Sequence, residues 1–131
     1  MHHTKTVGDL AELKVAARFA EKGYFVSRPL SEHAPYDLIV DKDNRLQKVQ
    51  VKARSIYKNG SVVVRKNTSN GPYSDGDFDL LALYCIDDER IVLLTWEELR
   101  STEGHEISLR VEKAKNNQTK HVRYFEDYLF N

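Results

Sequence analysis

Residues 35–54, PYDLIVDKDNRLQKVQVKAR, constrain the fold most strongly because they predict a β-hairpin whose register is fixed by its turn. Two runs in which apolar and polar residues alternate flank Asp43-Asn44, a residue pair that suits a two-residue hairpin loop. With this loop, Lys42 faces Arg45, and each step outward keeps the sum of the two paired residue numbers constant. The turn therefore decides which side chains stand opposite each other.

The same register collects polar groups on one face of the hairpin. Asp37 is expected to face Gln50, and Lys52 projects from the face of Gln50, one pair further out, because side chains alternate along a strand. The opposite face is expected to pack into the core and carries Leu38, Val40, Val49 and Val51. A carboxylate, an amide oxygen and an ammonium group are thus predicted to converge.

These groups match the chemistry of a hard divalent cation. Mg²⁺ takes oxygen ligands in an octahedron and keeps several waters, so Asp37, the Gln50 side-chain oxygen and a nearby backbone carbonyl would form a partial shell. Lys52 would stand beside the remaining waters, where it can orient a nucleophilic water, help to lower its pKa or offset charge on a phosphate. The plain alternative is that the three side chains form only the solvated face of a sheet.

The first predicted element is a helix over residues 7–22, with Thr6 as its N-cap and Gly23 at its end. Its predicted apolar stripe consists of Leu10, Leu13, Ala16, Ala17 and Ala20. Glu12 does not obey this pattern, because at about 100° per residue it falls on the flank that should face the sheet. It is the natural additional carboxylate for the predicted metal site, although a helix-flank Glu more often pairs with a Lys or Arg.

The rest of the pattern predicts a mixed sheet of about five strands flanked by helices, an α/β fold. A short strand is expected over residues 24–28, and Asn59-Gly60 predicts a second hairpin between residues 53–57 and 61–66. The turn-rich segment 67–77 is long enough to form a flap. The remaining predicted elements are strands at 78–86, 90–94 and 107–111, a helix from Thr95 as cap through Arg100, and a closing helix at 124–130.

Composition places the chain among single-domain soluble proteins. Its 131 residues, 40% of them hydrophobic and 31% charged, predict one domain over residues 1–131. Because no apolar stretch is long enough to cross a bilayer and the first residues lack the parts of a secretory signal, we expect a cytosolic, cytoplasmic protein with no membrane partner. Cys85 is the only cysteine, which excludes an internal disulfide, and its apolar neighbours predict a core position.

The formal net charge is zero, but the basic residues are unevenly placed. The stretch 44–74 contains no acidic residue, so its cations predict one basic face directed at a polyanion, although a run of charges is more often a solvated surface. The candidate phosphate contacts are Arg54, Lys58, Arg65 and Lys66 beyond the predicted site, and Lys113, Lys115 and Lys120 in a second patch.

Three short motifs resemble the PD-(D/E)XK nuclease superfamily: Glu12 on the first helix, then Pro35-Tyr36-Asp37, then Gln50-Val51-Lys52. They resemble the version in which Gln replaces the second acid. The fuller pattern GDLAELKVAARFAEKGYFVSRPL, APYDLIV and VQVKA is similar to small bacterial endonucleases of that superfamily, which include homing endonucleases encoded in group I introns. The resemblance spans residues 8–53 and implies a restriction-endonuclease-like core.

The resemblance implies a Mg²⁺-dependent phosphodiesterase, with Mn²⁺ as a substitute metal, that cuts double-stranded DNA to leave 5′-phosphate and 3′-hydroxyl ends. In such sites Asp37 ligates the metal directly, Gln50 through its amide oxygen and Val51 through its carbonyl. Lys52 serves the attacking water, and Glu12 holds a water of the metal shell or a second ion. Because Gln50 lacks the charge of a carboxylate, cation affinity is expected to be weaker, with Glu12 compensating.

One site breaks one strand, so a double-strand cut requires at least two subunits related by symmetry. A homo-oligomer, a dimer or a tetramer, is therefore expected, with residues 78–94 and the C-terminal YFEDYLF either in subunit contacts or in the core. Two other functions stay open. One is a structure-specific nuclease, such as a Holliday-junction resolvase or a repair or restriction enzyme; the other, suggested by Gln50, is a catalytically inactive DNA-binding module.

Overall fold

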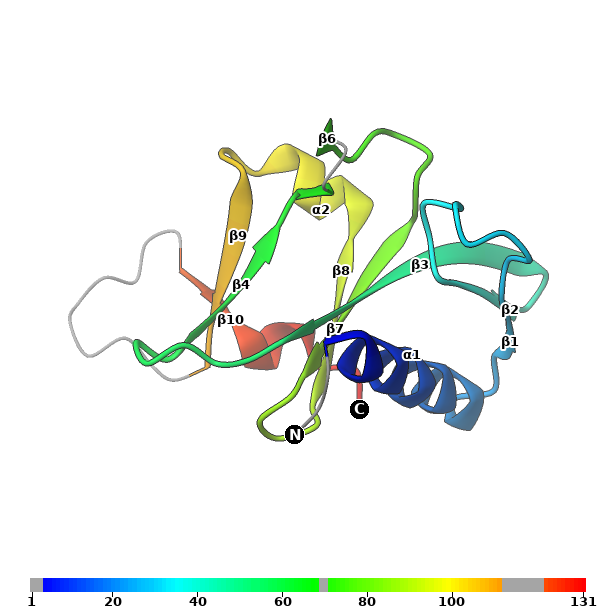
Figure 1. Cartoon of the computed structure of the whole chain (residues 1–131), viewed down its shortest axis with the longest axis horizontal. Helices are drawn as coiled ribbons and strands as arrows, with labels where there is room; N and C mark the ends of the chain where they lie inside the picture. The colour runs from blue at the N-terminus through cyan, green and yellow to red at the C-terminus, as the bar shows by residue number, and fades with distance from the viewer. Residues whose placement is uncertain (1–3, 69–70, 112–121) are drawn as a thin grey trace.

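The computed structural model describes residues 4–68, 71–111 and 122–131 (Figure 1). The helices are α1 (Thr4–Glu21), α2 (Trp96–Ser101) and the short 3₁₀ helix η1 (Phe125–Tyr128). The strands are β1 (Phe25–Ser27), β2 (Leu38–Lys42), β3 (Arg45–Arg54), β4 (Ser61–Arg65), β5 (Asn67–Thr68), β6 (Gly71–Pro72), β7 (Leu80–Cys85), β8 (Ile91–Thr95), β9 (Glu106–Arg110) and β10 (Arg123–Tyr124). Within these described ranges, no helix combines the length and the apolarity needed to cross a membrane.

Five strands form a mixed sheet in the order β1-β2-β3-β7-β8. Only β3 and β7 run parallel in it, and the other neighbours are antiparallel. A parallel pair needs a crossover connection, and here the crossover contains β4, which belongs to a second sheet of order β10-β9-β4, and the β5–β6 ribbon. The predicted α/β fold with a five-stranded mixed sheet is confirmed.

The five-stranded sheet is covered by different elements on its two faces. α1 packs on one face, whereas the second sheet and α2 lie on the other (Figure 1). The cluster under α1 contains Ala11, Val15, Phe19, Leu38, Val40, Val49 and Val51. The cluster on the opposite face includes Val62, Val64, Leu81, Leu83, Leu94, Leu99, Leu109 and Phe125. Because side chains alternate along a strand, β3 turns its valines toward α1 and its even-numbered polar residues toward the second sheet.

α1 differs from the predicted helix in its start and in the face that it buries. The helix begins at Thr4, so Thr6 lies inside it and is not its N-cap, whereas Gly23 ends it with a left-handed φ of 89°. The predicted stripe was wrong, because Leu13 is 67% exposed. The helix has two apolar faces, and the one with the bulkier Val15 and Phe19 fills the space over the sheet.

The predicted second hairpin at Asn59-Gly60 was also wrong. The turn closes, with Tyr57 N–H donating to the Ser61 carbonyl at 2.8 Å, but β4 does not return along β3. It pairs with β9 instead, because Val62 and Val64 are buried among the side chains of the second sheet. A second hydrogen bond, from Ile56 N–H to Asp87 Oδ2 at 2.5 Å, holds the departing chain near the β7–β8 turn.

The C-terminal elements belong to the core. Thr95 caps α2 as predicted by accepting a hydrogen bond from Glu98 N–H at 3.1 Å, and Cys85 is buried as predicted. The predicted closing helix is the four-residue η1, whose Phe125 is fully buried. An isolated bridge joins Val92 to Leu129, so this segment packs along β8. Residues 78–94 and the C-terminal segment were expected either in subunit contacts or in the core. The described residues fit packing in the core.

Candidate active site

The hairpin that carries the predicted site has the predicted turn. Asp43 and Asn44 have φ values of 54° and 63°, the left-handed backbone that a two-residue type I′ loop requires. The predicted pairing is confirmed from Lys42–Arg45 outward to Leu38–Val49. The ladder ends there, so the predicted pair of Asp37 with Gln50 is not part of it.

Asp37 instead contacts β3 on both sides of Gln50. Its backbone N–H donates to the Val49 carbonyl at 2.8 Å, and its Oδ2 accepts the backbone N–H of Val51 at 2.8 Å. A side-chain oxygen thus takes the place that a β2 carbonyl would fill in a longer hairpin. The carboxylate is held against the strand by this bond, and among residues 4–68, 71–111 and 122–131 no group bonds to Oδ1.

Val51 turns its backbone toward Asp37 and away from β7. The carbonyls of Lys48 and Arg54 accept from the β7 side, from Asp79 N–H and Ile86 N–H at 2.9 Å each. Because backbone groups alternate along a strand, the Val51 carbonyl points to the other edge of β3, where β2 has already ended. It lies on the same edge as the Asp37 carboxylate.

Gln50 and Lys52 project from the face of β3 opposite Val49 and Val51. The Lys52 side chain is partly buried, and its Nζ lies 5.5 Å from the centre of the Tyr73 ring. Burial lowers the pKa of Lys52, the charge of Arg54 lowers it further, and Asp37 opposes the shift. In the described part of the chain the Gln50 side chain has no hydrogen-bond partner, so its amide oxygen is available to a ligand.

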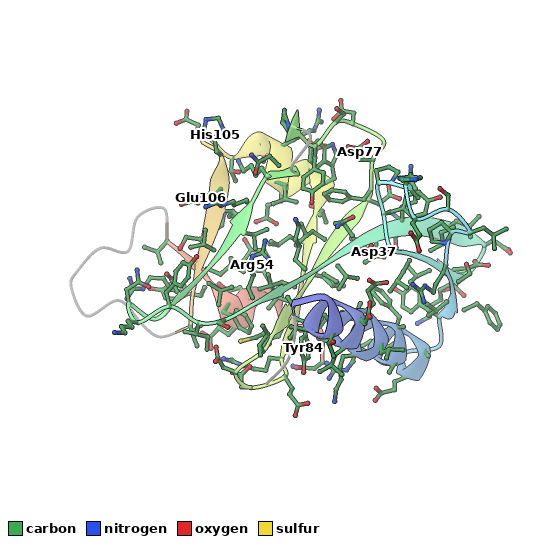
Figure 2. All side chains as sticks on the ribbon, in the orientation of Figure 1. Asp37, Arg54, Asp77, Tyr84, His105 and Glu106 are labelled. Carbon is green, nitrogen blue, oxygen red and sulfur yellow. The ribbon has the colours of Figure 1, made fainter. Side chains whose placement is uncertain are left out.

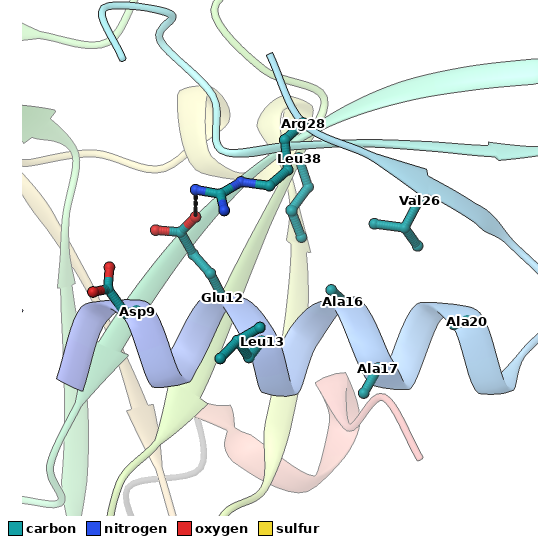
Figure 3. Close-up of a pocket in the computed structure, with 9 residues that line it drawn as sticks. All are labelled: Asp9, Glu12, Leu13, Ala16, Ala17, Ala20, Val26, Arg28 and Leu38. Carbon is teal, nitrogen blue, oxygen red and sulfur yellow. Dashed lines mark ion pairs between the residues drawn. The ribbon is translucent and has the colours of Figure 1, made fainter. Parts of the chain in front are cut away.

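Glu12 approaches Asp37 from α1. Its Oε1 lies 3.5 Å from Nη2 of Arg28, and its side chain is 25% exposed (Figure 3). Burial raises the pKa of Glu12, the charge of Asp37 raises it further, and Arg28 acts in the opposite direction. Glu12 and Asp37 line one pocket together with Arg28 and Tyr36. The structure therefore brings Glu12 within electrostatic reach of Asp37. It also pairs Glu12 with Arg28, as expected for a helix-flank Glu that has only a structural role.

Burial has the largest effect on the Asp37 carboxylate. Burial raises the pKa of Asp37, against the hydrogen bond from Val51 and the charges of Lys52 and Arg28. A cation next to two partly buried carboxylates stabilises their charged forms. Among the residues that the structure describes, no group of three or more His, Cys, Asp and Glu side chains is placed to hold a metal ion. A cation here would depend on two carboxylates together with amide and carbonyl oxygens.

This oxygen-only donor set fits a hard divalent cation. Asp37 Oδ1 and the Val51 carbonyl lie at the same edge of β3, Glu12 lies within electrostatic reach of Asp37, and Gln50 would supply an amide oxygen from the neighbouring position of the strand. A soft metal would instead require thiolate or imidazole ligands. The arrangement suits a cation that keeps several waters, one of which can act on a bound ester.

A family model described as PD-(D/E)XK endonuclease matches residues 2–131. The chain belongs to the PD-(D/E)XK endonuclease family. It is 33% identical over 104 residues to Protein 5.3 of Escherichia phage T7, an alignment that covers 76% of this chain and 86% of that protein. Its fold is similar to the solved structure of a bacterial homing endonuclease, I-Ssp6803I, with a TM-score of 0.77 and 30% identity, covering 98% of this chain and 89% of that one.

As a member of this family, the protein is a nuclease with DNA as its implied substrate. The residues predicted to contact phosphates have different surroundings in the structure. Arg54 lies at the end of β3 near the second sheet and donates to the Ala53 carbonyl at 2.8 Å (Figure 2). Lys66 donates to the Thr102 carbonyl at 2.7 Å, and burial lowers its pKa. Lys58 and Arg65 are exposed, and Lys113, Lys115 and Lys120 lie outside the described residues.

Sequence reasoning missed two residues that lie beside the candidate site, Arg28 and Tyr73. Arg28 falls just after β1 and reaches Glu12 only because β1 packs beside α1. Tyr73 lies in the segment expected to form a flap, yet it is buried beside Lys52. Neither residue carries a local sequence signal, because its position in the site depends on contacts between distant segments.

Proposed function

We propose that this chain is a homing-type, site-specific endonuclease, a single domain that hydrolyses phosphodiester bonds of double-stranded DNA with Mg²⁺. The observation that carries the proposal is the Asp37 carboxylate, docked on the Val51 N–H at 2.8 Å and within reach of the charges of Lys52 and Glu12. The likeness to a homing endonuclease at 30% identity, over 98% of this chain, supports the homing type.

Asp37, the Gln50 amide oxygen and the Val51 carbonyl would hold the cation, with Glu12 beside it or joined to it through a water. When bound, the cation lowers the pKa of the attacking water and neutralises charge on the phosphate. Mn²⁺ accepts the same oxygen ligands and is expected to substitute for Mg²⁺. Glu12 supplies the charge that Gln50 lacks, and Arg28 balances this carboxylate in the metal-free protein.

Lys52 orients the attacking water and offsets charge on the phosphate. Its lowered pKa increases the share of the neutral amine, which can accept a proton from that water. During hydrolysis the water oxygen bonds to phosphorus and loses a proton, while the bond from phosphorus to the 3′ oxygen breaks and that oxygen gains a proton. The products are a 5′-phosphate and a 3′-hydroxyl.

The DNA would run from this site along the second sheet. Arg54, Lys58, Arg65 and Lys66 continue from β3 through β4, where they would contact phosphates on the face that Gln50 and Lys52 share. Because one chain carries one such site, cutting both strands requires a homo-oligomer, either a dimer or a tetramer.

Nicking of supercoiled plasmid with Mg²⁺ or Mn²⁺ tests the chemistry. We expect Asp37→Ala and Lys52→Ala each to lower the nicking rate at least about 100-fold with the fold retained, because both groups lie off the apolar layer. Lys14→Ala is the matched control. Lys14 Nζ lies 2.9 Å from Glu89 Oε1, and this ion pair is away from the site. Nicking by Lys52→Ala at the wild-type rate would remove Lys52 from the mechanism.

The substrate distinguishes the homing type from a structure-specific nuclease. Linear duplexes of varied sequence and immobile four-way junctions are incubated with the protein and Mg²⁺, and the cut products are mapped. We expect cutting at one sequence context in duplex DNA. Cutting of junctions irrespective of sequence would replace the homing function by a junction resolvase.

One observation favours a second candidate, a DNA-binding module without activity. Gln50 replaces a carboxylate, and the described residues provide no group of three acidic, His or Cys ligands. Such a module would bind DNA in gel-shift experiments but leave plasmid intact at high protein concentration with either metal. That outcome would show that the protein is a DNA-binding module without nuclease activity.

A further inference from the structure

Tyr73 carries a buried hydroxyl group that has no hydrogen-bond partner among the described residues. The residue is only 8% exposed, and its hydroxyl oxygen lies in the interior with no donor or acceptor in the described structure. Most buried polar groups in proteins are hydrogen-bonded, so an unpaired phenol group requires an explanation. One recurring explanation is that its partner is a ligand.

The Tyr73 ring is fixed next to the candidate active site. It stands edge-on to Phe78, with ring centres 4.9 Å apart, and Phe78 in turn packs edge-on against Trp96 at 5.4 Å. Trp96 Nε1 donates to Asp75 Oδ1 at 2.8 Å, and this bond ties the loop between Tyr73 and Phe78 to Trp96. The ring therefore has little freedom, and Lys52 Nζ lies 5.5 Å from its centre.

The protonation state and the surroundings of Tyr73 indicate which ligand its hydroxyl can bind. Burial raises the pKa of Tyr73 to about 12, and the charge of Asp37 contributes to the shift. The hydroxyl therefore stays protonated at neutral pH, so it is a donor with no acceptor. The charges nearby are mixed: Lys52 and Arg54 are cations, and Asp37 and Asp77 are anions. The partner of a free donor must be an acceptor, and a phosphate oxygen that pairs with Lys52 is one.

We propose that the Tyr73 hydroxyl donates a hydrogen bond to a phosphate oxygen of bound DNA next to Lys52, which makes Tyr73 a further residue of the active site. The inference rests on the proposed nuclease function, because that function brings a phosphate to Lys52. The Lys52 ammonium group lies over the Tyr73 ring, and the hydroxyl would contact the ester that Lys52 serves. Tyr73 and Phe78 from the crossover between β3 and β7, together with Trp96 of α2, then position the site.

Tyr73→Phe tests this role because it removes only the hydroxyl. We expect the single-turnover rate of plasmid nicking in Mg²⁺ to fall about 10- to 100-fold, the effect of losing one hydrogen bond to a charged group. Binding of the same plasmid, measured with Ca²⁺ in place of Mg²⁺, should stay within about 3-fold of wild type, because the other phosphate contacts remain. The Tm of the metal-free variant should equal or exceed that of wild type, because the substitution removes an unpaired buried group.

Tyr24→Phe is the matched control. Tyr24 also carries a lysine over its ring, with Lys42 Nζ at 5.1 Å from the centre, but it packs against Phe19 on the α1 face. This variant should nick plasmid at the wild-type rate.

Three outcomes would overturn the inference. If wild type nicks plasmid and Tyr73→Phe matches it, the inference fails while the nuclease function stands. A lower Tm for metal-free Tyr73→Phe would assign the hydroxyl a structural partner. If wild type nicks nothing with either metal, the proposed function fails and the role of Tyr73 fails with it.

Discussion

At the scale of single residues, the candidate site brings two carboxylates together where partial burial disfavours their charged forms. Asp37 and Glu12 are both partly buried; burial raises the pKa of each carboxylate, and the charge of Asp37 raises the pKa of Glu12 further. Arg28 opposes these shifts, but its own side chain is 73% exposed, so solvent screens much of its effect. Binding sites commonly keep such unfavourable charge arrangements, because the ligand that relieves them is then bound more tightly.

We therefore expect Asp37→Asn to be more stable than wild type without metal, although it abolishes nicking. The asparagine oxygen can still accept the Val51 N–H, and the buried charge is gone. Because the folded pKa of Asp37 lies above its ordinary value of 3.8, the folded wild type binds the proton more tightly than the unfolded chain does. Its stability accordingly falls as the pH rises through the raised pKa, and the variant lacks this loss.

Thermal unfolding between pH 4 and pH 8 measures the effect, a window set by the ordinary pKa of 3.8 and the upward direction of the shift. The Tm difference between Asp37→Asn and wild type should be largest near pH 8 and shrink toward pH 4. Mg²⁺ should raise the Tm of wild type and not that of the variant. Asp127→Asn, at an exposed position in η1, is the control, and an equal gain from it would contradict the site-specific explanation.

At the scale of elements, the hairpin shows what local sequence determines. The turn residues and the alternation of apolar side chains lie within 20 residues, so the β2–β3 register and the face of each side chain could be predicted. The end of the ladder could not, because Asp37 replaces a backbone pairing by a side-chain bond to Val51. The path of β4 could not either, because its partner β9 is more than 40 residues away in sequence.

The turn should control both stability and activity. Asn44 has a left-handed φ of 63°, which a β-branched side chain tolerates poorly, so Asn44→Val is expected to lower the free energy of unfolding by about 1–2 kcal/mol. Asn44→Gly should leave it unchanged within a few tenths, because glycine adopts this backbone freely. Urea unfolding measures both variants.

Plasmid nicking by Asn44→Val should also fall, because the register of the hairpin holds Asp37 beside Val51. Asn44→Gly again serves as the comparison, because the loop differs while the strands do not. If Asn44→Val unfolds and nicks like Asn44→Gly, the turn does not determine the register of the site.

At the scale of the whole molecule, β3 joins the parts of the site. It pairs with β2 along its first half and with β7 along its second half, so the polar face at Gln50 and Lys52 lies where the strand leaves one neighbour and gains the other. The sequence predicted the residues that β3 itself carries. Tyr73 comes from the crossover and Arg28 from the segment just after β1, and only the assembled fold brings them to Lys52 and Glu12.

A molecule with one such site should cut two strands only by pairing with another copy. Mixing wild type with an excess of Lys52→Ala forms mixed oligomers in which one subunit is inactive. On a plasmid that wild type linearises, the mixture should shift the products from linear to nicked circles, in proportion to the fraction of mixed oligomers. Gel analysis of the products measures this shift, with Lys14→Ala in place of Lys52→Ala as the control that leaves linear product. If the mixture yields linear DNA as readily as wild type diluted alone, while ultracentrifugation finds only monomers, then one chain cuts both strands in succession.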